Sequence, residues 1–319
     1  MNRRYRSLLM RRCKCPHTIV LCVAALLFPW AVQAQQNQAW LPEKGHGAFS
    51  VGYQDLHIAY HTDSHGNKLV PGTIDDRSLF LNLDYGLTDK LALSVGLPYK
   101  SNRFVGPGTH NPCRRFVDCH GQHNIDDQHY HGSWGNWDLG LRYQWRSEPW
   151  AITPYISYGV PSHDYTTFAH AAVGTGQRRL ELGVNVGHRF AAPLQNLYFQ
   201  VSYGYSFMQV FDHRHVNHST LNLELGYYFT PRLTARLLMV GQKTHNGLNF
   251  PQDYPRGQTD EHFFAHDENL RDDYVNIIGG VNYQLNDHFA LFGSYGHTIW
   301  GENTHLIDHA ITFGISRSF

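Results

Sequence analysis

Charged residues are scarce in this 319-residue chain, at 16% of the total against roughly 25% in ordinary soluble domains. The chain also lacks apolar runs of about 20 residues, which excludes a bundle of transmembrane helices. Aromatic residues, in contrast, make up 14% of it, with 19 Tyr, 18 Phe and 7 Trp beside 29 Gly. This balance is typical of either a soluble β-sandwich or a membrane β-barrel.

The first 34 residues have the features of a secretory signal. Six basic residues precede an apolar run from Ile19 to Trp30, which is followed by Val32-Gln33-Ala34. Because this run is too short to span a bilayer as a helix, it predicts a signal peptide at residues 1–34, cleaved after Ala34. Residues 35–46 then form an N-terminal periplasmic or plug segment. The mature chain carries 20 basic and 26 acidic groups, net −6, which argues against a nucleic-acid partner.

Cysteine is also scarce. Three of the five cysteines leave with the signal, and Cys113 and Cys119 remain in a Pro- and His-rich segment. In a chain exported to an oxidising compartment this pair favours a disulfide. A metal site is the alternative, although the second cysteine pair of a zinc ribbon is missing.

Apolar residues recur at every second position through most of the mature chain, which is the period of a β-strand. The pattern predicts twelve strands, and the runs at 47–60 and 150–160 are the least regular. The predicted strands are 47–60, 78–85, 91–99, 137–145, 150–160, 180–190, 197–207, 221–229, 233–239, 275–285, 289–295 and 311–319.

The connections between these strands alternate in length. Those at 86–90, 146–149, 191–196, 230–232 and 286–288 are short. Those at 61–75, 101–133, 161–177, 209–219, 245–272 and 301–307 are mostly long and polar. Short turns at one rim and long loops at the other are typical of an outer-membrane barrel, with the turns in the periplasm. A soluble sandwich has no reason to sort its loops in this way.

The two faces of the predicted strands support the same class. One face carries Leu, Val and aromatic residues, and the other carries Gly, Ser, Ala, Asn and a few charges. A soluble sandwich would place many Lys, Glu and Asp on its second face, whereas small polar residues suit a lumen. The sequence therefore predicts an all-β fold, an antiparallel transmembrane β-barrel of about 12 strands spanning residues 47–319. Aromatic residues at strand ends predict interfacial girdles: Tyr85, Tyr99, Trp137, Trp145, Tyr227, Phe229, Tyr283 and Phe289.

The last strand ends in Phe319, with Ile311, Phe313 and Ile315 on the same face. It resembles the terminal signature through which bacterial outer-membrane barrels are recognised by their assembly machinery. Arg317 departs from an all-apolar series. The resemblance implies the outer membrane of a Gram-negative cell as location, with the lipid bilayer and that machinery as partners.

Charges of both signs fall on the predicted lumen face. Pairing between them is expected, because an unpaired buried charge is costly. A tight 230–232 turn would place Glu224 directly opposite Arg236. The set is interpreted either as a selectivity constriction or as a structural network in a narrow barrel. Its members are Asp84, Asp138, Arg142, Arg179, Glu181, Arg189, Glu224, Arg236 and Asp308.

Histidine is unusually frequent, with 23 in the chain, and most lie in predicted outer loops. His129-x-His131 and His213-x-His215 would each project two imidazoles to one side of an extended segment, a spacing that suits Zn, Cu or Ni. No carboxylate or thiolate completes a diagnostic spacing, so solvated or pH-responsive loops are the alternative. The candidate ligands are His120, His123, His129, His131, His213 and His215; a further group, His57, His61 and His65, clusters at the first loop.

The triplet His131-Gly132-Ser133 raises a third possibility, lipid hydrolysis by a barrel of the twelve-stranded phospholipase type. That chemistry needs a His, a Ser and a third polar residue that orients the His. No Asn or Asp stands at the family's spacing on the same face. The chain is therefore predicted not to be an enzyme, and no cofactor is expected.

Two stretches, Tyr85 to Tyr99 and Gly135 to Tyr143, resemble the transporter-like outer-membrane proteins named after the meta-pathway of phenol degradation. The resemblance implies passage of small molecules, aromatic or hydrophobic ones included, across the outer membrane. The leading hypothesis is a monomeric channel or transporter whose mouth is shaped by residues 101–133. The alternatives are a surface metal-binding barrel that uses the loop histidines and, more remotely, a lipid hydrolase.

Overall fold

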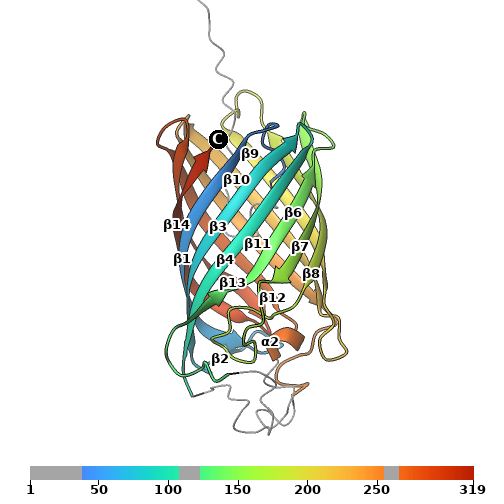
Figure 1. Cartoon of the computed structure of the whole chain (residues 1–319), viewed down its shortest axis with the longest axis vertical. Coiled ribbons are helices and arrows are strands. Elements are labelled where there is room, and N and C mark those ends of the chain that lie inside the picture. The colour runs from blue at the N-terminus through green and yellow to red at the C-terminus, as the bar shows by residue number, and fades with distance from the viewer. Residues whose placement is uncertain (1–37, 108–122, 255–265) are drawn as a thin grey trace, which may run out of the picture.

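The structure is a computed structural model that describes residues 38–107, 123–254 and 266–319. Within these residues, twelve long antiparallel strands close into a barrel, because β14 pairs with β1 as well as with β13 (Figure 1). Two short strands extend the wall: β2 pairs with β1, and β5 pairs with β4 beyond the end of β6. The elements are β1 (Gly47–Thr62), β2 (Lys68–Leu69), β3 (Thr73–Thr88), β4 (Leu91–Val105), β5 (His131–Trp134), β6 (Asn136–Tyr143), β7 (Trp150–Pro161), β8 (Arg179–Arg189), β9 (Leu197–Met208), β10 (Asn217–Thr230), β11 (Leu233–His245), α2 (His266–Asn269), β12 (Asp273–Gln284), β13 (Phe289–Glu302) and β14 (His305–Ser318).

The predicted barrel is confirmed, and each of the twelve predicted strands coincides with a long strand of the structure. Most strands continue further toward the long-loop rim than their alternation predicts. The expected loop at 301–307 is wrong for this reason: β13 and β14 are joined by Asn303 and Thr304 alone. Asn303 takes up the turn with a positive φ of 53°, a conformation that Asn tolerates better than most residues. In the described ranges, no helix is long and apolar enough to cross a membrane.

The predicted division of the two faces is also confirmed. Leu139, Leu225 and Phe313 are 47%, 50% and 56% exposed on the outer wall. The inward positions are buried and small, such as Ser50 and Ser206. The polar side chains thus line the interior, and the apolar ones face outward, as a bilayer requires.

Aromatic side chains cluster outward at both rims of the wall. Seven of the eight predicted girdle residues are exposed, and the largest exposed fraction at the short-turn rim is the 70% of Trp145. Tyr85 is only half-exposed, because its ring stacks on that of Phe319 at a centroid distance of 6.2 Å.

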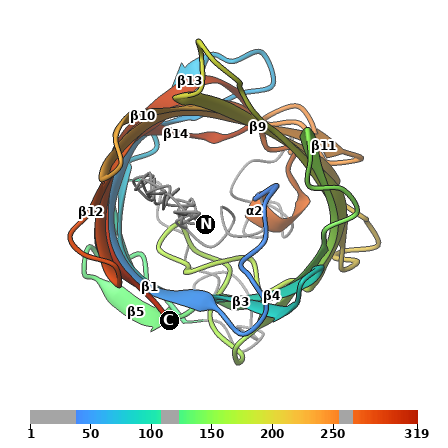
Figure 2. The ribbon, with the colours of Figure 1, turned by 90° about the horizontal axis from the view of Figure 1, so that it is seen from above.

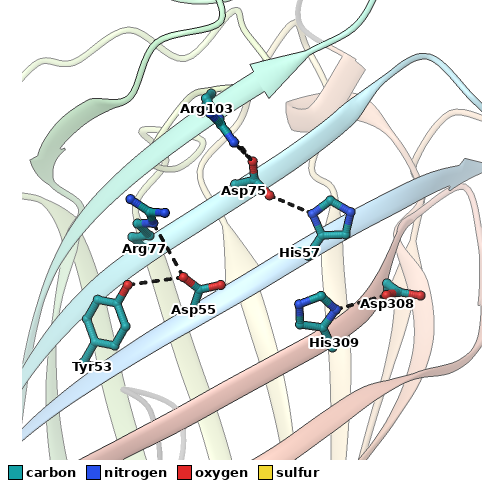
Figure 3. Close-up of polar contacts among 8 residues, drawn as sticks. All are labelled: Tyr53, Asp55, His57, Asp75, Arg77, Arg103, Asp308 and His309. Atoms are coloured by element: carbon teal, nitrogen blue, oxygen red, sulfur yellow. Dashed lines mark hydrogen bonds and ion pairs between the residues drawn. The ribbon is translucent and has the colours of Figure 1, made fainter.

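On the long-loop side, the outer faces of β1, β3 and β4 carry charges instead of apolar residues (Figure 3). Asp75 lies between two partners, with His57 Nδ1 at 2.7 Å and Arg103 Nη2 at 2.6 Å. Arg77 lies 3.6 Å from Asp55 on the neighbouring strand. Because charges on a lipid-facing wall are destabilising, this network marks the outer edge of the apolar belt. The last residues of β1 and the first of β14 stand beyond that edge.

Candidate functional site

A short segment before β1 lies inside the barrel at its short-turn end (Figure 2). Gln38, Ala39 and Trp40 are each less than 10% exposed. The Ala39 amide donates to Gln200 Oε1 at 2.8 Å, and its carbonyl accepts from Thr153 Oγ1 at 2.5 Å and from Gln144 Nε2 at 3.1 Å. Side chains of the wall, and not a strand ladder, therefore hold segment 38–40.

Trp40 fills a pocket in the inner wall. It packs with Ala39 and Ala151, and its ring meets Tyr198 edge-on at 6.2 Å. Gly187 makes room for it, because a Cβ at that position would lie 2.7 Å from Trp40 Cη2. The guanidinium of Arg189, one of the predicted lumen charges, stacks over the indole at 4.3 Å.

The predicted lumen charges Asp84 and Arg142 form an ion pair with Arg142 completely buried. Asp84 lies on β3 and Arg142 on β6, so the pair reaches over β4. Arg142 Nη1 also donates to the Gln38 carbonyl at 3.3 Å. This ion pair therefore supports the segment 38–40 as well as the wall.

Further toward the long loops, Arg179 lies between two acidic side chains. Its Nη2 is 2.6 Å from Asp138 Oδ1, and its Nη1 is 3.7 Å from Glu181 Oε2. Glu181 also accepts hydrogen bonds from Tyr155 Oη at 2.7 Å and from Ser206 Oγ at 2.9 Å. Such multiple pairing is what keeps buried charges stable in a polar interior.

Glu224 and Arg236 also meet, with Arg236 Nη1 3.8 Å from Glu224 Oε2. The expected direct opposition is wrong, however: Glu224 is opposite Leu238, and Arg236 is opposite Gly226. A register shift between Tyr228 and Thr230 displaces the two strands, so the charges meet diagonally. The last predicted lumen charge, Asp308, instead contacts the neighbouring His309 at 3.0 Å, beside the outer-wall network of Figure 3.

Between segment 38–40 and the long loops lies a cavity of about 480 Å³. Its charged lining among the described residues comprises Lys100 and Arg179 with Asp138, Asp267, Glu268 and Asp272. The acidic excess comes from α2 and the residues just after it, which cover the loop side of the cavity. Burial, together with the charge of Asp267, raises the pKa of Glu268 well above its ordinary value.

Among the predicted metal ligands, His129 and His131 lie around one carboxylate. His131 Nε2 is 2.8 Å and His129 Nδ1 is 3.5 Å from Asp127 Oδ1. The hydrogen bond from His131 lowers the pKa of Asp127. All three side chains are solvent-accessible, and that of His129 is 81% exposed.

The remaining predicted ligands are dispersed or lie outside the described part of the chain. His213 occupies a tight turn with a φ of 62°, His215 Nδ1 lies 3.4 Å from the Met208 carbonyl, and the His123 amide donates to Thr166 Oγ1 at 3.3 Å. The candidates outside the described residues are the signal peptide at 1–34, Cys113, Cys119 and His120.

The triplet considered for lipid hydrolysis is divided between two partners. His131 contacts Asp127, whereas the Ser133 hydroxyl lies 3.0 Å from Nε2 of His163. His131 and Ser133 thus have separate hydrogen-bond partners and are not paired with each other.

A different histidine group, His61, His266 and His305, assembles at the loop end. Its members come from the end of β1, from α2 and from the start of β14. No spacing in the sequence identifies such a group, because more than 200 positions separate His61 from His266. Only closure of the barrel, which pairs β1 with β14, brings His61 opposite His305.

No protein-family model and no curated protein matches this chain. Among solved structures, it is similar to an outer-membrane channel from Pseudomonas putida F1, with 12% identity over 88% of this chain and 98% of that one, at a TM-score of 0.67. It is also similar to the translocator domain of the autotransporter NalP from Neisseria meningitidis, with 9% identity over 87% and 90% of the two chains, at a TM-score of 0.51. At these identities the likeness shows the fold, and with the apolar outer wall it identifies the chain as an outer-membrane β-barrel protein.

Proposed function

We propose that this barrel is a channel for small molecules and that segment 38–40 narrows its periplasmic end. The charged cavity of about 480 Å³ carries the proposal. A barrel that only anchors a protein has no need for a polar interior space of this size, whereas a channel needs one through which water and solute can pass. The similarity to a solved outer-membrane channel supports the same function.

The way segment 38–40 is held suits a movable constriction. Its three residues contribute no strand to the barrel wall, and β1 begins only at Gly47. Release would therefore leave the twelve-stranded wall and its hydrogen bonds intact. We assign residues 35–46 to a plug segment that follows a cleaved leader, and its described residues 38–40 sit inside the short-turn end.

The cavity favours neutral or cationic solutes of mixed polarity. Even with Glu268 neutral, the remaining acidic groups of the lining outnumber its two basic ones, so the local field attracts cations and repels anions. Apolar and aromatic side chains also line it, among them Met208, Val216 and Tyr274. A small aromatic compound with a polar substituent matches this lining, in keeping with the family that the sequence resembles.

Liposome swelling tests the proposal with the purified, folded protein. We expect benzyl alcohol and benzylamine to enter faster than benzoate, because the three differ mainly in charge. Protein-free liposomes supply the background permeability, and heat-dependent mobility on SDS gels shows that the barrel is folded. A folded barrel that admits none of these solutes would refute the channel, whereas faster entry of benzoate would refute the assigned selectivity.

A further inference from the structure

The histidine cluster, defined here as His61, His266 and His305 with Asp267 beside them, lies at the outer mouth of the barrel. The ligand nitrogens of the three imidazoles all lie within 4.8 Å of one another. Asp267 Oδ1 is 3.1 Å from His266 Nε2 and 3.4 Å from His305 Nε2. Ring nitrogens from three separate segments thus lie close together, and two of them, from His266 and His305, contact the same carboxylate oxygen.

His61 is the member of the cluster whose burial is not accounted for by hydrogen bonds. It is 5% exposed, and its ring contacts are edge-on, with His305 at 4.7 Å, Phe250 at 5.4 Å and His266 at 5.9 Å. Within the described part of the chain, no hydrogen bond to its imidazole is formed. An imidazole that is held only by ring contacts keeps its nitrogens available to a ligand.

The spacing of the cluster is close to that of ligands around one metal ion. Ligands of a tetrahedral Zn²⁺ at about 2.0–2.2 Å are roughly 3.3–3.6 Å from each other. The two contacts of Asp267, at 3.1 and 3.4 Å, are already near this value. The nitrogens of the three imidazoles now lie within 4.8 Å of one another, so the most distant pair must approach by up to about 1.5 Å, which a rotation of the rings can supply.

We propose that His61, His266 and His305 bind a divalent transition-metal ion of the Zn²⁺ class, with Asp267 as the fourth ligand. Three imidazoles and one carboxylate are the N and O donors that Zn²⁺ accepts in proteins. Asp267 Oδ1 already faces the Nε2 atoms of His266 and His305, so the carboxylate is placed to complete the donor set.

The proposed ion would fasten α2 to the barrel wall. His61 and His305 belong to paired strands, whereas His266 and Asp267 belong to the four-residue helix. Asp267 and the adjacent Glu268 also line the cavity. Metal binding would thus fix the lid of the cavity and neutralise one acidic group at its entrance. This effect on passage rests on the proposed channel, but the binding site itself does not.

Calorimetric titration of the metal-stripped full protein with ZnCl₂ tests the site. Loss of an outer-shell partner weakens a metal site about 10–100-fold, so we expect His266→Gln, which removes a direct ligand, to weaken the tightest Zn²⁺ site by at least about 100-fold. His266 lies outside the barrel strands, so the wall should fold in this variant. His305→Gln is the second variant, and its folding is checked by heat-dependent mobility.

The matched control is His129→Gln/His131→Gln, which removes two loop imidazoles that also lie near a carboxylate. This double variant should retain the tight site at one ion per chain. X-ray absorption at the zinc edge should show three imidazoles and one oxygen donor in the parent. The proposal is overturned if the parent has no tight site, if the tight site survives in His266→Gln and His305→Gln, or if the control abolishes it.

Single-channel conductance distinguishes a protein that lacks the Zn²⁺ site from one that lacks channel activity. Zn²⁺ should reduce the single-channel current of the parent and leave that of His266→Gln unchanged. Tight binding in a barrel that passes no current contradicts the channel alone. An open channel without a tight Zn²⁺ site contradicts the metal proposal alone.

Discussion

The pocket for Trp40 in the inner wall makes Gly187→Val an informative change. A Cβ at position 187 would lie 2.7 Å from both Ala39 Cβ and Trp40 Cη2, whereas carbon atoms in contact prefer about 3.5–4.0 Å. Valine is otherwise compatible with a strand. The substitution should therefore displace segment 38–40 and leave the barrel closed.

The size of the expected effect follows from the free energy that segment 38–40 gains by binding in the lumen. Trp40 is 8% exposed, and a Trp that buries about 150–250 Å² contributes about 4–6 kcal/mol at ~25 cal/mol per Å². The three hydrogen bonds of Ala39 add about 3 kcal/mol in total. Ordering three residues costs about 3–6 kcal/mol. The net of about 3 kcal/mol corresponds to a roughly 100-fold preference for the bound position, most of which the Gly187→Val substitution should abolish.

Labelling of Gln38→Cys with a charged maleimide measures this preference. Gln38 is 5% exposed in the bound segment, so labelling should be slow in the Gln38→Cys parent and up to ~100-fold faster when Gly187→Val is added. The chain without Gln38→Cys gives the background from Cys113 and Cys119. Gly279→Val is the matched control, because a Cβ there meets nothing within 4 Å. Equal labelling rates in the parent and in Gly187→Val, or an equal increase in both valine variants, would show that Gly187 does not provide the space for Trp40.

Three further changes probe the interior. Arg179→Gln leaves two acidic side chains without their shared cation; we expect destabilisation by about 3–5 kcal/mol, measured by urea unfolding, and a shift of the reversal potential toward cation selectivity. Glu268→Gln should change the reversal potential at alkaline pH and not at acidic pH, because the raised pKa keeps Glu268 neutral until the pH exceeds it; a pH-independent difference would contradict this. Gly183→Ala places a Cβ in steric overlap with the Tyr155 ring, so urea unfolding should show a loss of about 1–3 kcal/mol from overpacking, and an unchanged midpoint would contradict it.

The sequence predicts the barrel well because strand pairing repeats one simple rule. Each strand must alternate between lipid and lumen, so Leu139 and Leu141 face outward and Asp138 and Arg142 inward, as expected. The sorted connections then define the two rims. The extent of the strands beyond the bilayer is less predictable, because wall residues such as Asp75 and Arg103 face water and need no apolar alternation.

Which side chains pair inside the lumen depends on strand register and distance, which the period-2 sequence pattern does not specify. Asp84 and Arg142 are both predicted to face the lumen, but their pairing across an intervening strand follows from the register of three strands. A single bulge changes which residue faces Arg236. Trp40 lies in a segment with no periodic pattern, so only its contacts in the folded barrel reveal that it occupies the lumen.

Single-channel recording in planar bilayers shows whether the barrel is a channel narrowed by its N-terminal segment, when the mature chain is compared with a variant that lacks residues 35–40. We expect low conductance for the mature chain and a larger, steadier conductance for the shortened one, since the wall from Gly47 onward is unchanged. Equal conductance in the two proteins, or none in either folded barrel, would contradict it.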